Sequence, residues 1–286
     1  MSSQRKALPL SSPKGFIFFP LAWVSAASLT VSVLSGIFLS FHYYYYQPLE
    51  SVLKIITFVP AGKYLRSLHY FSSQIALTTL FLHLIDSLYK RFYLLKGKLS
   101  WFFLIFSFFL LLFVTFTGYL LRADETGELA GNIAENLTLN LPIIGNLLNK
   151  IFFALSEAGL IRVYHWHIFL SFFLVTGIFL FHIKIRALFT WNRIGYFLIL
   201  LPIPLFWEFP LRPYQGISAR GPWFFIGAQE MLKVFPPQLV FLWLILIFFI
   251  FLGYSFFPKK YKLLDFGLVI YLIIYMGFSL AFFVIG

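Results

Sequence analysis

The chain has 286 residues, of which 60% are hydrophobic and only 11% are charged, with a mean hydropathy of +0.88 and a net charge of +12. Soluble domains carry about 25% charged residues, so this composition excludes an ordinary soluble protein and indicates an integral membrane protein. The chain contains no cysteine. It therefore forms no disulfide, ligates no iron–sulfur cluster and attaches no cofactor through thioethers.

Seven apolar segments are predicted to cross the membrane, because about 20 apolar residues span its hydrocarbon core. In chain order these segments are A (16–46), B (65–92), C (100–121), D (162–188), E (195–208), F (237–257) and G (263–285). Segment E is short and is interrupted by Pro202 and Pro204. The basic start of the chain has no small-residue cleavage site before segment A, so we expect no cleavable signal. The polar stretches 122–161 and 209–236 are long enough for short surface helices.

The basic residues predict the orientation of these segments. If the N-terminus is cytoplasmic, that side holds 13 cations and only two acids, which gives it a net charge of +11 against +1 outside. This asymmetry follows the positive-inside rule and predicts a multi-pass protein of a prokaryotic cytoplasmic membrane, with its N-terminus inside. The charge of +12 is explained by topology, so we expect no nucleic-acid partner.

Four histidines form two pairs, each on its own apolar segment. His69 and His83 are 14 residues apart on segment B, and His167 and His182 are 15 apart on segment D. In an α-helix the second side chain lies about 40° behind the first after 14 residues and about 60° ahead after 15, and the two are about 21–22 Å apart along the axis. Since B and D run in the same direction, His69 matches His167 near the outer face, and His83 matches His182 near the inner face.

Histidines inside membrane segments are rare and usually functional. Two imidazoles at each depth would provide both axial ligands of a haem, and the chain would bind two haems. Zinc is the main alternative, but it usually takes four ligands. We expect His42, beside four tyrosines at the end of segment A, to be an interfacial residue, and His165, about 200° from His167, to point away from the haem.

Small residues and arginines accompany the histidines. Gly36 in segment A and Gly118 in segment C would let the backbone approach a porphyrin, or serve ordinary helix packing. Arg66 lies about one turn before His69, and Arg162 lies five residues before His167. Both arginines could neutralise haem propionates at the outer face, or extend to lipid headgroups.

Five stretches of the sequence resemble the cytochrome b subunit of quinol-oxidising cytochrome bc complexes, the Rieske/cytochrome b type. The similar stretches are 34–43 (LSGIFLSFHY), 66–69 (RSLH) with 82–83 (LH), 118–121 (GYLL), 141–145 (LPIIG), and 162–167 (RVYHWH) with His182. The resemblance is specific over residues 16–190. The 15-residue spacing on segment D is closer to the chloroplast and cyanobacterial branch.

This resemblance implies an all-α membrane protein in two parts. Residues 1–190 would form a four-helix bundle, A–D, around two non-covalent b haems, and residues 191–286 would add about three transmembrane helices and a loop of the outer quinol site. The implied activity is quinol:cytochrome c oxidoreduction, in which quinol is oxidised outside and quinone is reduced inside. A Rieske iron–sulfur protein and a c-type cytochrome would be partners, and the complex would be a dimer.

The quinone sites depart from the family's pattern. Residues 222–225 (PWFF) resemble its Pro-Glu-Trp-Tyr signature, but Pro222 stands where the glutamate is expected. Glu230, and then Glu208, are the candidate proton acceptors of the outer site. In segment C, Arg122-Ala123 replaces the family's Pro-Trp, and Asp86 replaces a basic residue beyond His83. Arg186, Lys184 and Asp86 are the candidate residues of the inner quinone site.

These departures keep two other functions open. The chain could be a dihaem cytochrome that links a dehydrogenase or multihaem cytochrome to the quinone pool at a single site. It could also be a transporter or assembly scaffold without haem, although the histidine spacing would then have no explanation.

Overall fold

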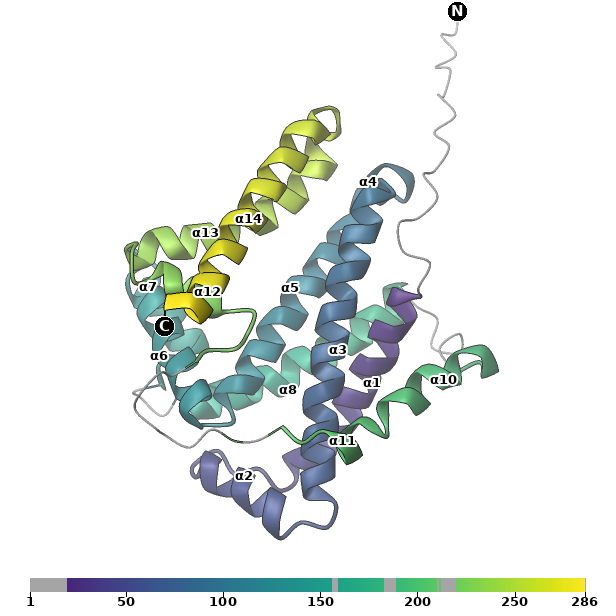
Figure 1. The fold of residues 1–286 in the computed structure, drawn as a ribbon, viewed down its shortest axis with the longest axis vertical. Coiled ribbons are helices and arrows are strands. Elements are labelled where there is room, and N and C mark those ends of the chain that lie inside the picture. The colour runs from purple at the N-terminus through teal and green to yellow at the C-terminus, as the bar shows by residue number, and fades with distance from the viewer. Residues whose placement is uncertain (1–19, 156–158, 183–188, 210, 212–219, 286) are drawn as a thin grey trace, which may run out of the picture.

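The computed structural model describes the chain except residues 1–19, 156–158, 183–188, 210, 212–219 and 286; at 182 and 285 it describes the backbone only. The described residues form helices joined by short loops (Figure 1). The longer helices are α1 (Leu21–Ser40), α3 (Gly62–Tyr89), α5 (Lys98–Leu120), α8 (Leu160–Gly177), α13 (Pro237–Phe256) and α14 (Tyr261–Ile285). The shorter elements are α2 (Pro48–Thr57), α4 (Phe92–Leu95), α6 (Glu125–Leu139), α7 (Gly145–Phe152), η2 (Ile178–His182), α10 (Trp191–Leu200), α11 (Ile203–Phe206), α12 (Ile226–Met231) and η3 (Pro258–Lys260).

Helices α1, α3, α5 and α8 form the predicted four-helix bundle. Helix α1 packs against α3, α3 against α5, α5 against α8, and α8 against α1, so the four helices close a ring. The protein is an all-α, multi-pass membrane protein. Among the described residues, α1, α5, α8 with η2, α13 and α14 are long and apolar enough to cross a membrane. Helix α3 has 28 residues and is also long enough, but its polar residues lower its hydropathy.

The region that was predicted as segment E is divided near Pro202. Helix α10 ends at Leu200, and the four-residue helix α11 begins at Ile203. Proline lacks the amide hydrogen that a continuous helix needs, which explains the interruption. The two pieces pack on α1 and α3 respectively, beside the bundle (Figure 1).

Helices α13 and α14 form an antiparallel pair on the α5 side of the bundle (Figure 1). The indole of Trp101 in α5 is fully buried and donates a 2.9 Å hydrogen bond to the carbonyl oxygen of Phe251 in α13. Tyr275 of α14 donates a 2.7 Å hydrogen bond to the carbonyl oxygen of Phe224, just before α12. The C-terminal pair therefore holds the 222–225 segment against the bundle.

Candidate haem site in the four-helix bundle

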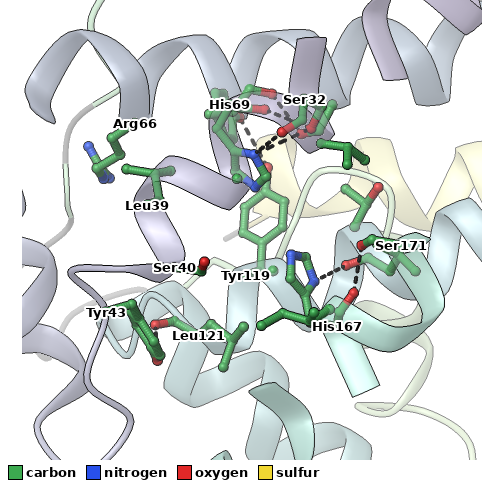
Figure 2. A pocket seen from close by; sticks show the side chains of 18 of the residues that line it. Ser32, Leu39, Ser40, Tyr43, Arg66, His69, Tyr119, Leu121, His167 and Ser171 are labelled. Carbon is green, nitrogen blue, oxygen red and sulfur yellow. Dashed lines mark hydrogen bonds between the residues drawn. The ribbon is translucent and has the colours of Figure 1, made fainter. Parts of the chain in front are cut away.

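His69 of α3 and His167 of α8 face each other inside the bundle (Figure 2). Their ring centroids are 6.2 Å apart, and the ring planes are inclined by 71°. A metal-bound imidazole nitrogen lies about 2 Å from its metal, and the ring centre about 1 Å further away, so two rings on opposite sides of one metal have centroids roughly 6 Å apart. The separation of this pair, called the outer pair below, therefore fits two axial ligands of one iron.

Backbone carbonyls orient both rings. The Nδ1 atom of His69 lies 2.8 Å from the carbonyl oxygen of Ser32, and that of His167 lies 3.0 Å from the carbonyl oxygen of Val114. A carbonyl oxygen only accepts hydrogen bonds, so each Nδ1 carries the proton and donates it. The lone pair of each neutral ring is then on Nε2, which is the arrangement that histidine metal ligands usually have.

Two glycines make room for the two rings. A Cβ atom at Gly36 would lie 2.9 Å from Cε1 of His69, and one at Gly118 would lie 3.1 Å from Cε1 of His167. Both distances are shorter than a normal carbon–carbon contact, so any larger residue would displace the ring beside it. The sequence predicted that Gly36 would allow a close approach of the backbone. In the structure, the group that approaches it is the ring of His69 on the neighbouring helix.

A cavity of about 350 Å³ adjoins the outer pair and is lined by residues of all four bundle helices, of α2 and of the segments between helices, including Phe209. This volume lies in the usual range of small-molecule and cofactor sites. Most of its lining is apolar, and its two charged members are Arg66 and Arg122. Among the described residues, no group of three or more His, Asp or Glu side chains could hold a metal, so zinc would lack its usual four ligands here.

The arginines near the cavity differ from the sequence prediction. Arg66 lines the cavity and donates a 2.6 Å hydrogen bond to the carbonyl oxygen of Phe209. Arg162 is not among the lining residues and donates to the carbonyl oxygen of Phe153 at 3.4 Å. Arg122 lines the cavity although it was not predicted as a site residue. In the sequence, the one indication for Arg122 was that a charged residue stands where the family has Pro-Trp.

Comparison with known proteins identifies the family. The model of the family described as Cytochrome b/b6/petB matches residues 8–188, which is more than half of the chain. The chain belongs to the cytochrome b/b6 family. It is 32% identical to cytochrome b6 of Heliomicrobium gestii over 142 residues, which cover 48% of this chain and 65% of that protein. It is 29% identical to cytochrome b of Mytilus edulis over 169 residues, covering 56% and 42% of the two chains.

The fold agrees with this family. A chain of a solved structure titled "Hyperthermophilic respiratory Complex III" superposes with a TM-score of 0.68 at 15% identity, covering 93% of this chain and 88% of that chain. At this identity the match supports the fold alone. The aligned region spans 65% or less of the curated relatives given above, and all of the family-model match lies before α10. The cytochrome b/b6 resemblance is therefore carried by the bundle.

The inner pair, His83 and His182, is described only in part. His83 of α3 borders a small cavity of about 30 Å³, together with Ala22, Leu104 and Ile178. His182 ends η2, and only its backbone is described. Lys184 and Arg186 lie outside the described residues. Asp86 is buried and forms a 2.5 Å ion pair with Lys90 one turn further along α3.

The 15-residue spacing on α8 has a structural counterpart. The helix changes to a π-helix over Ile178–His182, directly before the second histidine of the pair. A π-helical turn holds one more residue than an α-helical turn. One additional residue in the turn takes up about 100° of rotation, so the backbone from residue 167 to residue 182 turns about as far as 14 α-helical residues would. The spacing of 15 on α8 thereby matches the spacing of 14 on α3.

The segment that resembles the outer quinol signature lies beside the cavity. The indole of Trp223 donates a 2.8 Å hydrogen bond to the side chain of Gln74, a lining residue, and the ring of Phe224 lies 5.9 Å from that of Tyr119, another lining residue. Glu230 is buried on α12, with one oxygen 2.9 Å from Lys233 and the other, Oε1, without a hydrogen-bond partner. Glu208 is exposed and pairs with Lys63 at 2.7 Å.

The two remaining histidines lie at the surface. The Nδ1 atom of His165 is 2.6 Å from the carbonyl oxygen of Ile161, one turn before it, and the side chain is exposed. His42 is also exposed, and its Nδ1 atom lies 3.4 Å from the carbonyl oxygen of Phe38. Neither histidine lines the cavity, in agreement with the sequence analysis.

Proposed function

We propose that this chain is the cytochrome b subunit of a quinol-oxidising, bc-type complex, with two b haems held by His69–His167 and His83–His182. The observation that carries this proposal is the geometry of the outer pair. Two partly buried imidazoles lie 6.2 Å apart, and each Nδ1 donates to a backbone carbonyl. His69 and His167 would hold the haem iron between them, and a haem held by two imidazoles would supply single-electron transfer rather than oxygen binding.

The residues around the outer pair support tight binding of a flat macrocycle. Gly36 and Gly118 let α1 and α5 approach the two rings, and Ser32 and Val114 fix the ring orientations through their carbonyl oxygens. An orientation fixed before the cofactor binds lowers the entropic cost of coordination. Arg66 supplies a buried positive charge at the same cavity.

Quinol oxidation is proposed at the outer side, next to residues 222–225. The contacts of Trp223 with Gln74 and of Phe224 with Tyr119 support this location, because they connect the segment to the cavity lining. Glu230 is the first candidate for proton acceptor, since its Oε1 is buried without a partner, and Glu208 is the second. Quinone reduction is proposed at the inner side, near Asp86, Lys184 and Arg186.

The proposed assembly follows from the same function. The chain has no cysteine, so a Rieske iron–sulfur protein and a c-type cytochrome would provide the branch that accepts the other electron. We place the complex, as a dimer, in a prokaryotic cytoplasmic membrane. The cytoplasmic N-terminus is proposed from the distribution of basic residues alone.

A second candidate function is favoured by one feature of the sequence. Pro222 stands where the family's signature has its glutamate, and that substitution removes a proton acceptor from the outer quinol site. A dihaem cytochrome that connects a dehydrogenase or multihaem cytochrome to the quinone pool would need only one quinone site.

Redox titration of purified membranes, combined with haem extraction, tests these proposals. We expect two b-type components with different midpoint potentials and two haems per chain. A preparation without haem would overturn both cytochrome functions. Purification of the intact complex then separates the two. A stoichiometric Rieske protein supports the bc-type complex, and a dehydrogenase or multihaem cytochrome in its place supports the alternative.

A further inference from the structure

Arg122 is a buried arginine at the outer end of α5, two residues beyond the last residue of the helix. Its side chain forms an ion pair with Asp124 through Nη2. The second carboxylate oxygen of Asp124 accepts a 3.2 Å hydrogen bond from the backbone amide of Gly127, which caps α6. Asp124 is only 3% exposed, and it is fixed both by the helix cap and by the arginine. The position of the guanidinium group is therefore defined by the fold.

The ion pair leaves part of this guanidinium without partners. Nε and Nη1 of Arg122 are buried, and neither has a hydrogen-bond partner. A buried donor without an acceptor costs about 1–3 kcal/mol, and more when the group is charged. Buried polar groups in native proteins almost always have a partner, so two orphaned donors on one buried cation indicate that an acceptor is missing.

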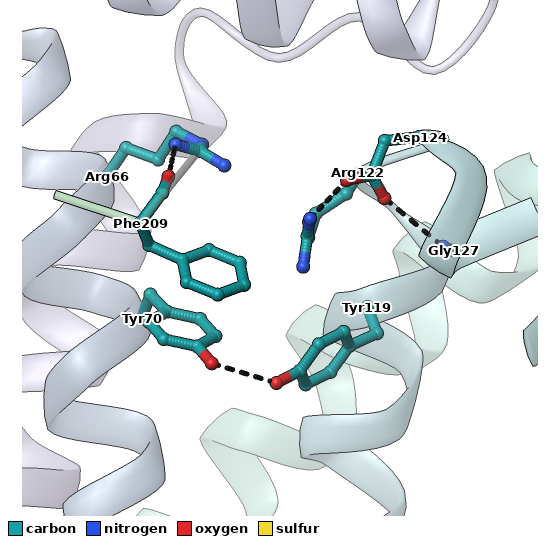
Figure 3. A network of polar contacts seen from close by, with 7 residues as sticks. All are labelled: Arg66, Tyr70, Tyr119, Arg122, Asp124, Gly127 and Phe209. Carbon is teal, nitrogen blue, oxygen red and sulfur yellow. Dashed lines mark hydrogen bonds and ion pairs between the residues drawn. The ribbon is translucent and has the colours of Figure 1, made fainter. Parts of the chain in front are cut away.

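Arg122 and Arg66 approach the same aromatic ring. The central guanidinium carbon of Arg122 lies 4.4 Å from the ring centroid of Phe209, and that of Arg66 lies 5.9 Å from it. Figure 3 shows Arg66 above the ring of Phe209 and Arg122 beside it, with the hydrogen-bonded hydroxyls of Tyr70 and Tyr119 below. Both guanidinium groups thus lie at one end of the cavity that contains the outer pair.

The charges at this end of the cavity are unbalanced. Among the described residues that line it, Arg66 and Arg122 are charged and no aspartate or glutamate is present. Asp124 offsets one positive charge, but its two oxygens are already used by Arg122 and by the cap of α6. Glu208, the other acid that interacts with Arg66, is exposed and is paired with Lys63. The two buried arginines therefore exceed the one buried carboxylate, which favours the binding of a further anion.

We propose that Arg122, together with Arg66, binds a carboxylate of the haem that His69 and His167 hold. Haem b carries two carboxylates on one edge of its ring, and a planar guanidinium with two free donors suits a carboxylate acceptor. This inference rests on the proposed function, since it requires a haem at the outer pair. It assigns to Arg122 the role that the sequence suggested for Arg162, which bonds a backbone carbonyl outside the cavity lining.

The variant Arg122→Gln in the intact complex tests this assignment. The reduced haem carries one more negative charge than the oxidised haem, so a nearby cation stabilises the reduced form. We expect Arg122→Gln to lower the midpoint potential of the outer haem and to shift the propionate bending band in its resonance Raman spectrum. Arg122→Lys keeps the charge and should restore most of the potential. The matched control, Arg162→Gln, should change neither measurement.

Three outcomes would overturn the assignment. These are an unchanged potential and Raman band in Arg122→Gln, a larger shift in Arg162→Gln, and equal shifts in Arg122→Lys and Arg122→Gln. Should Arg122→Gln fail to fold because Asp124 loses its ion pair with Arg122, the double variant Arg122→Gln/Asp124→Asn removes both charges and keeps a good helix cap. Its Raman band should still shift, and an unchanged band would also overturn the assignment. Wild-type protein without haem would instead refute the proposed function, so the two failures are distinguishable.

Discussion

The outer and inner histidine pairs have similar spacing in the sequence but different surroundings in the fold. The outer pair adjoins a cavity of about 350 Å³, and the cavity beside His83 measures about 30 Å³. Glycines 36 and 118 approach the outer rings. Fourteen residues before them on the same helices stand Ala22 and Leu104, and both line the small cavity at His83.

The 14-residue step explains why these positions correspond. His83 follows His69 by 14 residues on α3. Helices α1 and α5 run in the opposite direction, so the corresponding positions lie 14 residues earlier: Ala22 before Gly36 on α1, and Leu104 before Gly118 on α5. Each step keeps a side chain within about 40° of the same helix face. Leu104 is buried in the main hydrophobic core, at 4% exposure. The spacing of the histidines is therefore repeated at the inner pair, but the glycines beside the outer rings are not, since alanine and leucine stand at the corresponding positions.

The largest effect is expected from removing a ligand of the outer pair. His167→Ala should abolish haem binding at this site, because one imidazole cannot supply both axial ligands. Haem content should fall from two to one per chain, with loss of one component in the redox titration. His165→Ala, two residues away and exposed, is the matched control and should retain both components. Full haem content in His167→Ala would refute the assignment of the ligand.

The second largest effect is expected from filling the space beside the rings of the outer pair. Gly118→Leu should displace the ring of His167, since even a Cβ atom would lie 3.1 Å from it. Overpacking of this kind costs about 1–3 kcal/mol, which corresponds to roughly 5- to 150-fold weaker haem binding. Haem loss to an excess of an acceptor protein measures the change. Gly267→Ala on α14, where nothing lies within 4 Å of the new atom, should leave the loss rate unchanged.

A smaller effect distinguishes the inner site from the outer one. The inner haem should be lost before the outer haem during stepwise detergent extraction, because Ala22 and Leu104 restrict its space. Leu104→Ala should slow that loss and bring the two rates closer together. Leu80→Ala, which shortens another residue of the same lining, serves as the control for a general loosening of the core. Earlier loss of the outer haem would contradict the importance of the glycines.

The smallest effect is expected at the hydrogen bonds of the outer rings. The hydroxyl of Thr117 lies 3.0 Å from Nδ1 of His167, which also bonds the carbonyl oxygen of Val114. Thr117→Val removes this contact and also the 2.7 Å hydrogen bond that the hydroxyl donates to the carbonyl oxygen of Val114. Each is worth about 0.5–1.5 kcal/mol, and their loss should shift the midpoint potential of the outer haem slightly. Thr115→Val should not shift it, since that hydroxyl bonds Leu111 within α5. Equal shifts in the two variants would exclude a specific effect of Thr117.

Sequence periodicity accounts for much of the fold and of the outer site. The apolar runs predicted α1, α5, α8, α13 and α14, and the histidine spacing predicted that His69 and His167 would face each other. These features depend on the α-helix itself, whose rise and turn per residue are fixed by its backbone hydrogen bonds. The two-part division at residue 190 stays a prediction, as do the roles of Glu230, Glu208 and the inner quinone residues.

Features at the ends of the helices required the tertiary structure. Arg66 and Arg162 lie near the first residues of α3 and α8, and Arg122 lies just beyond the last residue of α5. The sequence favoured Arg66 and Arg162 because each precedes a histidine. Phe209, from a distant part of the chain, contacts both Arg66 and Arg122 at the cavity, and the nearby Asp124 fixes Arg122 there through an ion pair. The π-helical turn before His182 is likewise not visible in a hydrophobic pattern.

The sequence by itself determined the membrane character, the four-helix bundle and the facing positions of His69 and His167, because composition and helical periodicity are local properties of the chain. The tertiary structure decided how much space each histidine pair has and which arginines border it. Those properties depend on side chains that distant segments bring together. Because helices are closely packed, a side chain in place of a glycine, or an arginine at the cavity, is enough to make the two sites differ in space and charge.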